Sequence, residues 1–224
     1  MIDFIKDPSF YTLVRGPLVW IAFIIFIAGS IYRVKSLIDL AKKEKVIFPF
    51  INLKATLKSI FHWIIPFGSK NWRLRPVITT VTFLFHICLV FTPLFLLAHN
   101  ALFYESWGIK WISLPEWVAD IMTIIVIVSC VIFLLRRLFA PEVKFVTFSS
   151  DYLILAISFF PFITGFLAYH QMLLPYKVMV ILHMLFGEIM LIAIPFTRLA
   201  HMFYFFMTRS WMGSQFALWH SKDW

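Results

Sequence analysis

Five apolar runs, each long enough to cross a lipid bilayer, constrain this chain more than any other feature of its sequence. A membrane-spanning helix needs about 20 mostly apolar residues, and the runs lie at about 13–32, 77–99, 116–135, 152–170 and 178–206. The second is the clearest, since no Asp, Glu, Lys or Arg occurs between Pro76 and Tyr104. We therefore predict an all-α integral membrane protein with a five-helix transmembrane bundle.

Composition supports this prediction and excludes several other classes of protein. Apolar residues make up 62% of the 224 residues and charged residues only 14%, whereas soluble domains have about 25% charged residues. The excess of apolar surface is too large for one core to bury. Nucleic-acid binding requires a basic face on a folded soluble module, and we expect none. With no repeat or linker visible, residues 1–224 are expected to form a single membrane domain.

The distribution of positive charge predicts the orientation of the chain. Five spans place the termini on opposite sides, and sixteen Lys and Arg fall on one side against four on the other: Lys6, Arg15, Lys110 and Lys177. Because positive residues favour the cytoplasmic side, we predict an outside N-terminus and a cytoplasmic C-terminus. The expected location is the inner (cytoplasmic) membrane of a bacterium or archaeon.

The cytoplasmic segment 33–76 between spans one and two carries ten of these basic residues and is too polar to span. Within it, apolar residues recur at helical spacing while Lys54 and Lys58 lie on another face: Leu53, Leu57, Ile60, Phe61, Ile64 and Ile65. This pattern predicts an interfacial amphipathic helix on the cytoplasmic surface. A docking surface for a cytoplasmic partner fits the same pattern. The tail after Trp211, with Trp219 and Trp224, also has an interfacial composition.

Histidines inside the spans are the candidate functional residues. Ionisable side chains are rare in bilayers and usually functional, and neutral imidazole is a frequent haem ligand. His86 and His201 are expected near the cytoplasmic side, and His99 and His183 near the outer side. On a continuous helix, the 18-residue spacing of His183 and His201 would place both on one face. Two cross-helix pairs at matching depths are what two stacked bis-histidine haems require.

The position of His99 is less simple than that of the other three. Thirteen residues of ideal helix separate it from His86 by a net rotation of about 220°, so the two should not share a face. A kink at Pro93 would re-aim His99. His170 is the alternative fourth ligand at the outer side.

Two further charged residues belong to the same hypothesis. Arg198, three residues before His201, is placed either to pair with a haem propionate or to reach the interface as a snorkelling arginine. Glu188 is an unpaired carboxyl group in an apolar run, which suggests either proton handling beside a quinone or a structural hydrogen bond. Several outer-side residues could line such a quinone site: Asp120, Lys110, Lys177, Tyr169 and His170.

Four sequence stretches resemble a known family: FLFHI (83–87), RRLFAPEV (136–143), SDYLILA (150–156) and LHMLFGEIMLIAIPFTRLAH (182–201). They are similar to the gamma subunit of respiratory nitrate reductase, a five-helix di-haem cytochrome b with an outside N-terminus. The resemblance covers about residues 76–206. It implies that His86, His183 and His201 are haem ligands, and that two haems b exchange electrons with menaquinone.

The second ligand on span two departs from the nitrate reductase pattern, whose shorter spacing would fall on Leu96. The stretch PLFLLAHN (93–100), which places His99 after Pro93, and the long basic insert at 41–75 look more like the cytochrome b subunits of the Hmc, Tmc and Dsr-type complexes of sulfate reducers. That likeness implies several partners: a cytoplasmic iron–sulfur subunit, a periplasmic multihaem cytochrome c and other membrane subunits. The alternatives are a haem-free membrane anchor of such a complex, the nitrate reductase gamma subunit proper, and a transporter, but a transporter would show inverted repeats.

Overall fold

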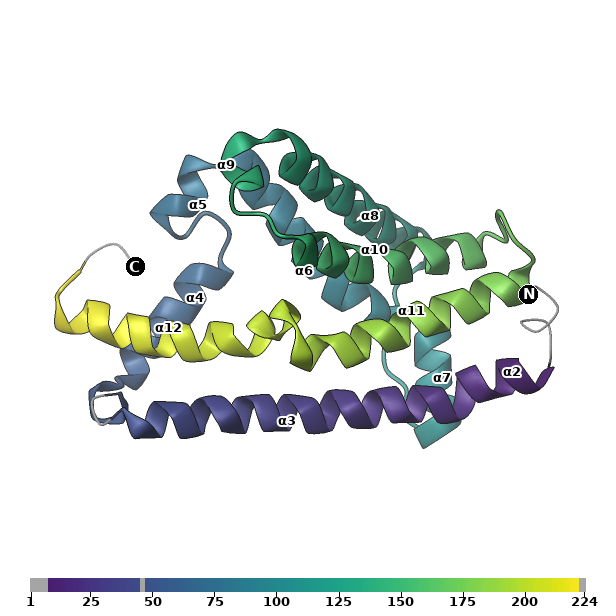
Figure 1. The fold of residues 1–224 in the computed structure, drawn as a ribbon, viewed down its shortest axis with the longest axis horizontal. Helices are drawn as coiled ribbons and strands as arrows, with labels where there is room; N and C mark the ends of the chain where they lie inside the picture. Colours follow the sequence, from purple (N-terminus) through teal and green to yellow (C-terminus); the bar gives the residue numbers. More distant parts are fainter. Residues whose placement is uncertain (1–7, 45–46, 222–224) are drawn as a thin grey trace. The chain divides into compact units, whose positions relative to one another are not determined.

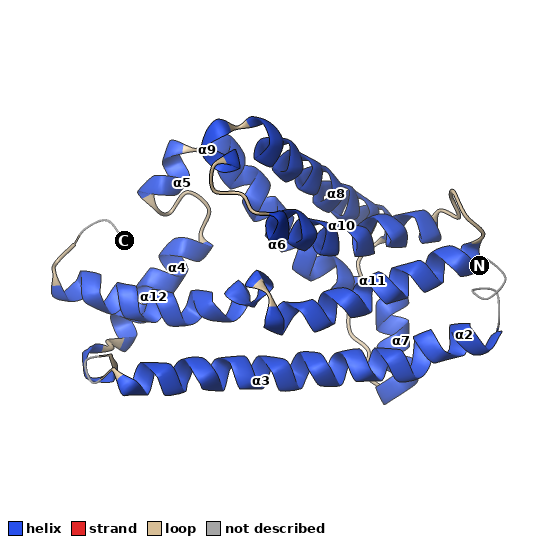
Figure 2. Cartoon of the chain, in the orientation of Figure 1, coloured by secondary structure: helices blue, strands red, loops and turns tan. Residues whose placement is uncertain are grey.

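The computed structural model describes residues 8–44 and 47–221, and within these ranges every regular element is a helix. Figures 1 and 2 show the course of the chain and its helices. Lys6, Lys45, Lys222 and Trp224, which entered the charge and tail arguments, lie outside the described residues.

Five helical segments are long and apolar enough to cross a membrane, as predicted. The first, Pro8–Lys43, consists of α2 (Pro8–Leu13), a π-helical turn η1 (Val14–Leu18) and α3 (Val19–Lys43). The other four are single helices: α6 (Pro76–Phe95), α8 (Glu116–Phe139), α10 (Ser149–Tyr169) and α11 (Tyr176–Phe196). In each segment, at most 28% of the most apolar 18-residue stretch is buried inside the protein. Most of its apolar surface is therefore exposed and needs an apolar environment such as lipid. The chain is an all-helical membrane protein.

Shorter helices connect the five segments and complete the chain. They are η2 (Phe48–Phe50), α4 (Leu53–Ile64), α5 (Lys70–Leu74), α7 (Leu97–Trp107), α9 (Pro141–Lys144), η3 (Arg198–Ala200) and α12 (His201–Leu218).

Two of the predicted spans end earlier than expected. The second stops at Phe95 instead of 99, and Leu96 is extended (φ −69°, ψ 132°) before α7 begins. The fifth stops at Phe196 instead of 206, and Thr197 is extended (φ −120°, ψ −173°). In both cases a proline lies just before the end of the helix, Pro93 two residues before Phe95 and Pro195 one residue before Phe196, where it removes a backbone donor and crowds the preceding turn.

The second of these breaks corrects one step of the sequence argument. His201 begins the new helix α12, so it does not lie on one continuous helix with His183. The inference that both project from one face of that helix was wrong, because Pro195 ends α11 and a 3-10 turn intervenes.

The chain forms two compact units, which we describe separately. Unit 1 comprises residues 1–19 and 81–190, and unit 2 comprises residues 20–80 and 191–224. The core of unit 1 joins three helices, and its most buried members are Phe85 and Cys88 of α6, Val126 and Cys130 of α8, and Phe162 of α10. Both cysteines are free and buried, where a thiol packs as a small apolar side chain.

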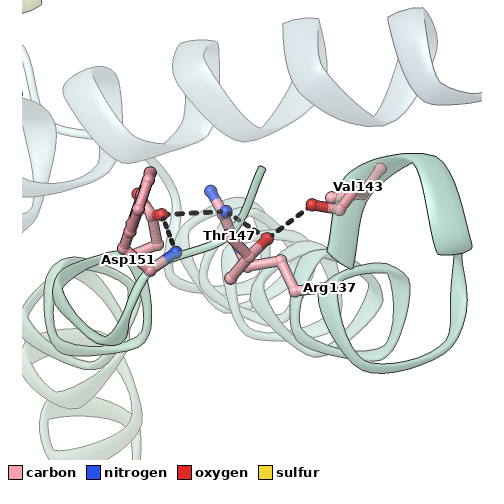
Figure 3. Close-up of polar contacts among 5 residues, drawn as sticks. Arg137, Val143, Thr147 and Asp151 are labelled. Atoms are coloured by element: carbon pink, nitrogen blue, oxygen red, sulfur yellow. Dashed lines mark hydrogen bonds and ion pairs between the residues drawn. The ribbon is translucent and has the colours of Figure 1, made fainter. Parts of the chain in front are cut away.

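The turn between α8 and α10 is held by a carboxylate (Figure 3). Asp151, 7% exposed, accepts a hydrogen bond from the Phe148 backbone N–H at 2.8 Å and lies 3.8 Å from the Arg137 guanidinium. Thr147 Oγ donates to the Val143 carbonyl at 2.7 Å. Because an acidic residue in the first turn satisfies a free backbone donor, Asp151 fixes the start of α10 and its approach to α8.

Unit 2 contains a close helix pair. Small residues of α4 (Ala55 and Ser59) face Gly213 of α12, where a Cβ atom would lie only 2.5 Å from Ser59 Cβ. Thr56 Oγ lies 3.0 Å from Ser210 Oγ across the same seam. Small residues allow such close packing in membrane proteins. A helix therefore forms at 53–64, as predicted. It packs against α12 through its small and polar residues and not through its large apolar ones.

Candidate functional site

His99 and His183 lie together in unit 1. His99 is in the first turn of α7 and His183 in the second turn of α11. Their ring centroids are 5.8 Å apart, and the ring planes are nearly parallel, at 14°. The two residues are 84 positions apart in sequence, so the fold brings this predicted pair together.

Each of these rings is oriented by a backbone carbonyl from a proline. His99 Nδ1 donates to Pro93 O at 2.8 Å, and His183 Nδ1 donates to Pro161 O at 2.9 Å. The carbonyls in the last turn of a helix have no intrahelical partner, so the end of α6 at Phe95 makes Pro93 O available. A ligating histidine usually donates its other ring N–H in this manner. Nε2 is therefore the nitrogen of each ring that remains for an iron ion.

Glycines keep the surroundings of His183 clear. An ideal Cβ on Gly165 of α10 would lie 2.9 Å from His183 Cε1, so only glycine admits this ring position. Gly187 lies one helical turn after His183, on the same face of α11. A Cβ there would meet nothing within 4 Å. The helix face beside His183 is thus open, as a flat ligand bound next to the ring would require.

The other two predicted ligands, His86 and His201, show the same orientation of the ring. His86 Nδ1 donates to Thr82 O at 2.7 Å, and His201 Nδ1 donates to Arg198 O at 2.9 Å. Both side chains are exposed. They belong to different units, so their pairing stays a prediction. Arg198 begins the short helix η3 next to His201, and its role toward a propionate also stays a prediction.

His170, the alternative fourth ligand, is engaged elsewhere. Its Nε2 lies 3.3 Å from Asp120 Oδ1, and its ring packs edge-on against Tyr169. The nitrogen that His99 and His183 leave for an iron ion is occupied by a carboxylate in His170. This contact favours His99 as the partner of His183.

Glu188 lies on α11, five residues after His183. It is only 6% exposed, and its Oε1 atom is buried with no hydrogen-bond partner among residues 8–44 and 47–221. The structural hydrogen bond considered from sequence is not seen at that oxygen. The carboxyl group therefore has a free oxygen within the apolar part of the chain.

Sequence reasoning did not identify Gly165, Pro161 or the role of Pro93 as a hydrogen-bond acceptor. The prolines inside apolar runs indicated breaks or distortions of the helices, but they did not indicate that the prolines' own carbonyls would accept from histidine rings. Gly165 gave no signal of its own, since a single glycine in an apolar run is common in membrane helices.

Comparisons with known proteins find one relative of almost the same length. A protein of Nitratidesulfovibrio vulgaris (strain Hildenborough) is 37% identical over 213 residues, which cover 93% of this chain and 94% of the relative. The chain belongs to the same family as this protein. No family model matches the chain, and no solved structure matches it. The family relation thus covers nearly the whole membrane chain, both units included.

Proposed function

We propose that this chain is a di-haem b membrane subunit that transfers electrons between the menaquinone pool and partner redox subunits of an anaerobic respiratory complex. The observation that carries the proposal is the parallel His99–His183 pair with both Nδ1 atoms bound to carbonyls. No such orientation is needed for two histidines that only fill space between helices.

The separation of the rings fits an iron ion between them. Two imidazole rings that hold one metal ion through bonds of about 2 Å would have centroids about 6 Å apart. The observed distance is 5.8 Å. His99 and His183 would hold the outer haem, and His86 and His201 the inner haem.

Haem supplies one-electron transfer, and the protein supplies ligation, spacing and surroundings. The carbonyls of Pro93 and Pro161 fix which ring nitrogen faces the iron ion, and Gly165 admits the His183 ring. In this proposal Arg198 would bind a haem propionate. Glu188 would accept a proton when menaquinol is oxidised and would supply one when menaquinone is reduced.

The orientation and the partners form part of the proposal. The charge distribution supports an outside N-terminus and a cytoplasmic C-terminus. The large apolar residues of α4 point away from α12, with Leu53, Leu57 and Phe61 each at least 46% exposed, which supports an interfacial position for this helix. The proposed partners are a cytoplasmic iron–sulfur subunit and a periplasmic multihaem cytochrome c.

The function is tested by mixing the purified chain with a reduced menaquinone analogue and following the b-haem absorbance. We expect the analogue to reduce the haem, and Glu188→Gln to slow this reduction at least 10-fold while the haem content stays unchanged. If chemically reducible haem is present but no quinol reduces it, the quinone step is wrong. If no haem is present, the chain is a haem-free anchor.

A further inference from the structure

Arg209 of α12 is a buried cation in unit 2 that forms no ion pair with any described residue. It is 9% exposed, and its Nη1 atom is buried with no hydrogen-bond partner among the described residues. Its other contacts are the Trp63 ring, 4.4 Å from the guanidinium carbon, and the Met212 sulfur, which accepts from Nη2 at 2.7 Å. Neither is an anion, and leaving a buried charge unpaired is costly.

The chain itself offers few anions to unit 2. This unit contains thirteen Lys and Arg and only three Asp and Glu, a net charge of +10, so it carries all of the chain's formal positive charge of +9. Of its acidic residues, Asp39 lies 3.9 Å from Lys42, and Asp223 is outside the described residues. No ion pair formed by residues 8–44 or 47–221 includes Arg209.

A second donor lies beside Arg209. The Trp63 indole Nε1 is also buried without an acceptor in the described part of the chain. Trp63 packs edge-on against Trp72 of α5, with centroids 5.5 Å apart. A guanidinium and an indole N–H can only donate hydrogen bonds, so the site needs oxygen acceptors. Burial lowers the pKa of Arg209, but arginine stays charged in proteins, and an anion is required.

The surroundings favour a lipid phosphate as that anion. The apolar stripe of α4 is exposed on the side opposite to its seam with α12, and Lys54 and Lys58 flank it. Such a helix lies at the level of the lipid headgroups. Tryptophan is enriched at this level, and basic sites near the cytoplasmic leaflet attract anionic lipids.

We propose that unit 2 binds the phosphate of an anionic membrane lipid at Arg209 and Trp63, between α4 and α12. The Arg209 guanidinium supplies the positive charge and an N–H donor at Nη1, and the Trp63 indole supplies a second N–H donor at Nε1. The α4–α12 seam, closed by Gly213 and Ser59, holds the two donors side by side. This proposal depends on the chain being a membrane protein, but it does not depend on haem binding.

The test measures lipid binding to the full chain by native mass spectrometry, with phosphatidylglycerol, phosphatidylcholine or inorganic phosphate added to the detergent solution. We expect phosphatidylglycerol to bind at least 10-fold more tightly than phosphatidylcholine. Arg209→Gln should remove this preference. Trp63→Phe, which keeps the ring but removes the N–H, should weaken phosphatidylglycerol binding about 3-fold or more. Lys35→Gln, which changes an exposed lysine of α3 in the same unit, is the control and should keep the preference.

Each contrary outcome would overturn the proposal. Equal binding of both lipids, or an unchanged preference in both Arg209→Gln and Trp63→Phe, would show that these residues bind no lipid phosphate. Equally tight binding of inorganic phosphate would show a free-anion site. Loss of a co-purifying subunit in Arg209→Gln, without any lipid effect, would assign the counter-charge to a protein carboxylate. The haem content of the same samples reports separately on the proposed function.

Discussion

Gly165→Ala tests the geometry of the outer histidine pair most sharply. The added Cβ would lie 2.9 Å from His183 Cε1 and 3.0 Å from His183 Nδ1, whereas ordinary contacts begin at 3.4 Å. The ring must therefore move by about 0.5 Å, or α10 and α11 must separate by a similar distance. Metal–ligand distances vary by only about 0.2 Å, so this displacement exceeds what iron ligation accommodates.

The magnitude follows from the cost of overpacking. Inserting one methyl group into a closely packed site costs about 1–3 kcal/mol, which corresponds to roughly 5- to 150-fold weaker occupancy of the outer haem. The assay is haem quantification combined with a redox titration that resolves the two b components. We expect Gly165→Ala to lose the outer component and to retain the inner one.

Gly213→Ala is the matched control in unit 2. Its Cβ would lie 2.5 Å from Ser59 Cβ, which is a steric conflict at least as severe but remote in sequence from His99 and His183. This variant should lower the thermal unfolding temperature and keep the outer haem. If Gly165→Ala retains both haems with wild-type potentials, the assignment of the outer site to His183 and His99 is refuted.

Three further substitutions test the ligand choice and the α8–α10 turn. His99→Ala should remove the outer haem, whereas His170→Ala should leave it, because His170 Nε2 already contacts Asp120; haem loss only in His170→Ala would reverse the assignment. Asp151→Ala removes the acceptor for the Phe148 N–H and should lower stability by about 1–2 kcal/mol, measured by thermal unfolding in detergent. An unchanged unfolding temperature would show that this carboxylate does not hold the turn.

The five apolar segments could be predicted from sequence because bilayer thickness sets a length that few other structures need. The re-aiming of His99 was also accessible, since Pro93 lies inside the second run and a proline interrupts the helical hydrogen bonds. The structure places the actual break at Leu96, three residues later. His183 could be paired with His99 because both were expected at the same depth.

The rest could not be read from the chain alone. The fifth run contains a proline of the same kind, Pro195, but the apolar run continues beyond it and was interpreted as one helix, so the break before His201 was missed. The apolar spacing in 53–65 predicted a helix but not the partner of its small-residue face, because Ser59 and Gly213 meet only after folding. Glycine contacts and carbonyl acceptors depend on tertiary geometry, which local sequence patterns do not encode.

The central claim is that histidines of this chain bind two haems b, and haem quantification on the isolated full-length chain tests it most directly. The measurement is a reduced-minus-oxidised spectrum together with the amount of haem per polypeptide. The account predicts a b-type spectrum and about two haems per chain, of which His183→Ala removes one. A chain that is folded and membrane-inserted but contains no haem would contradict it.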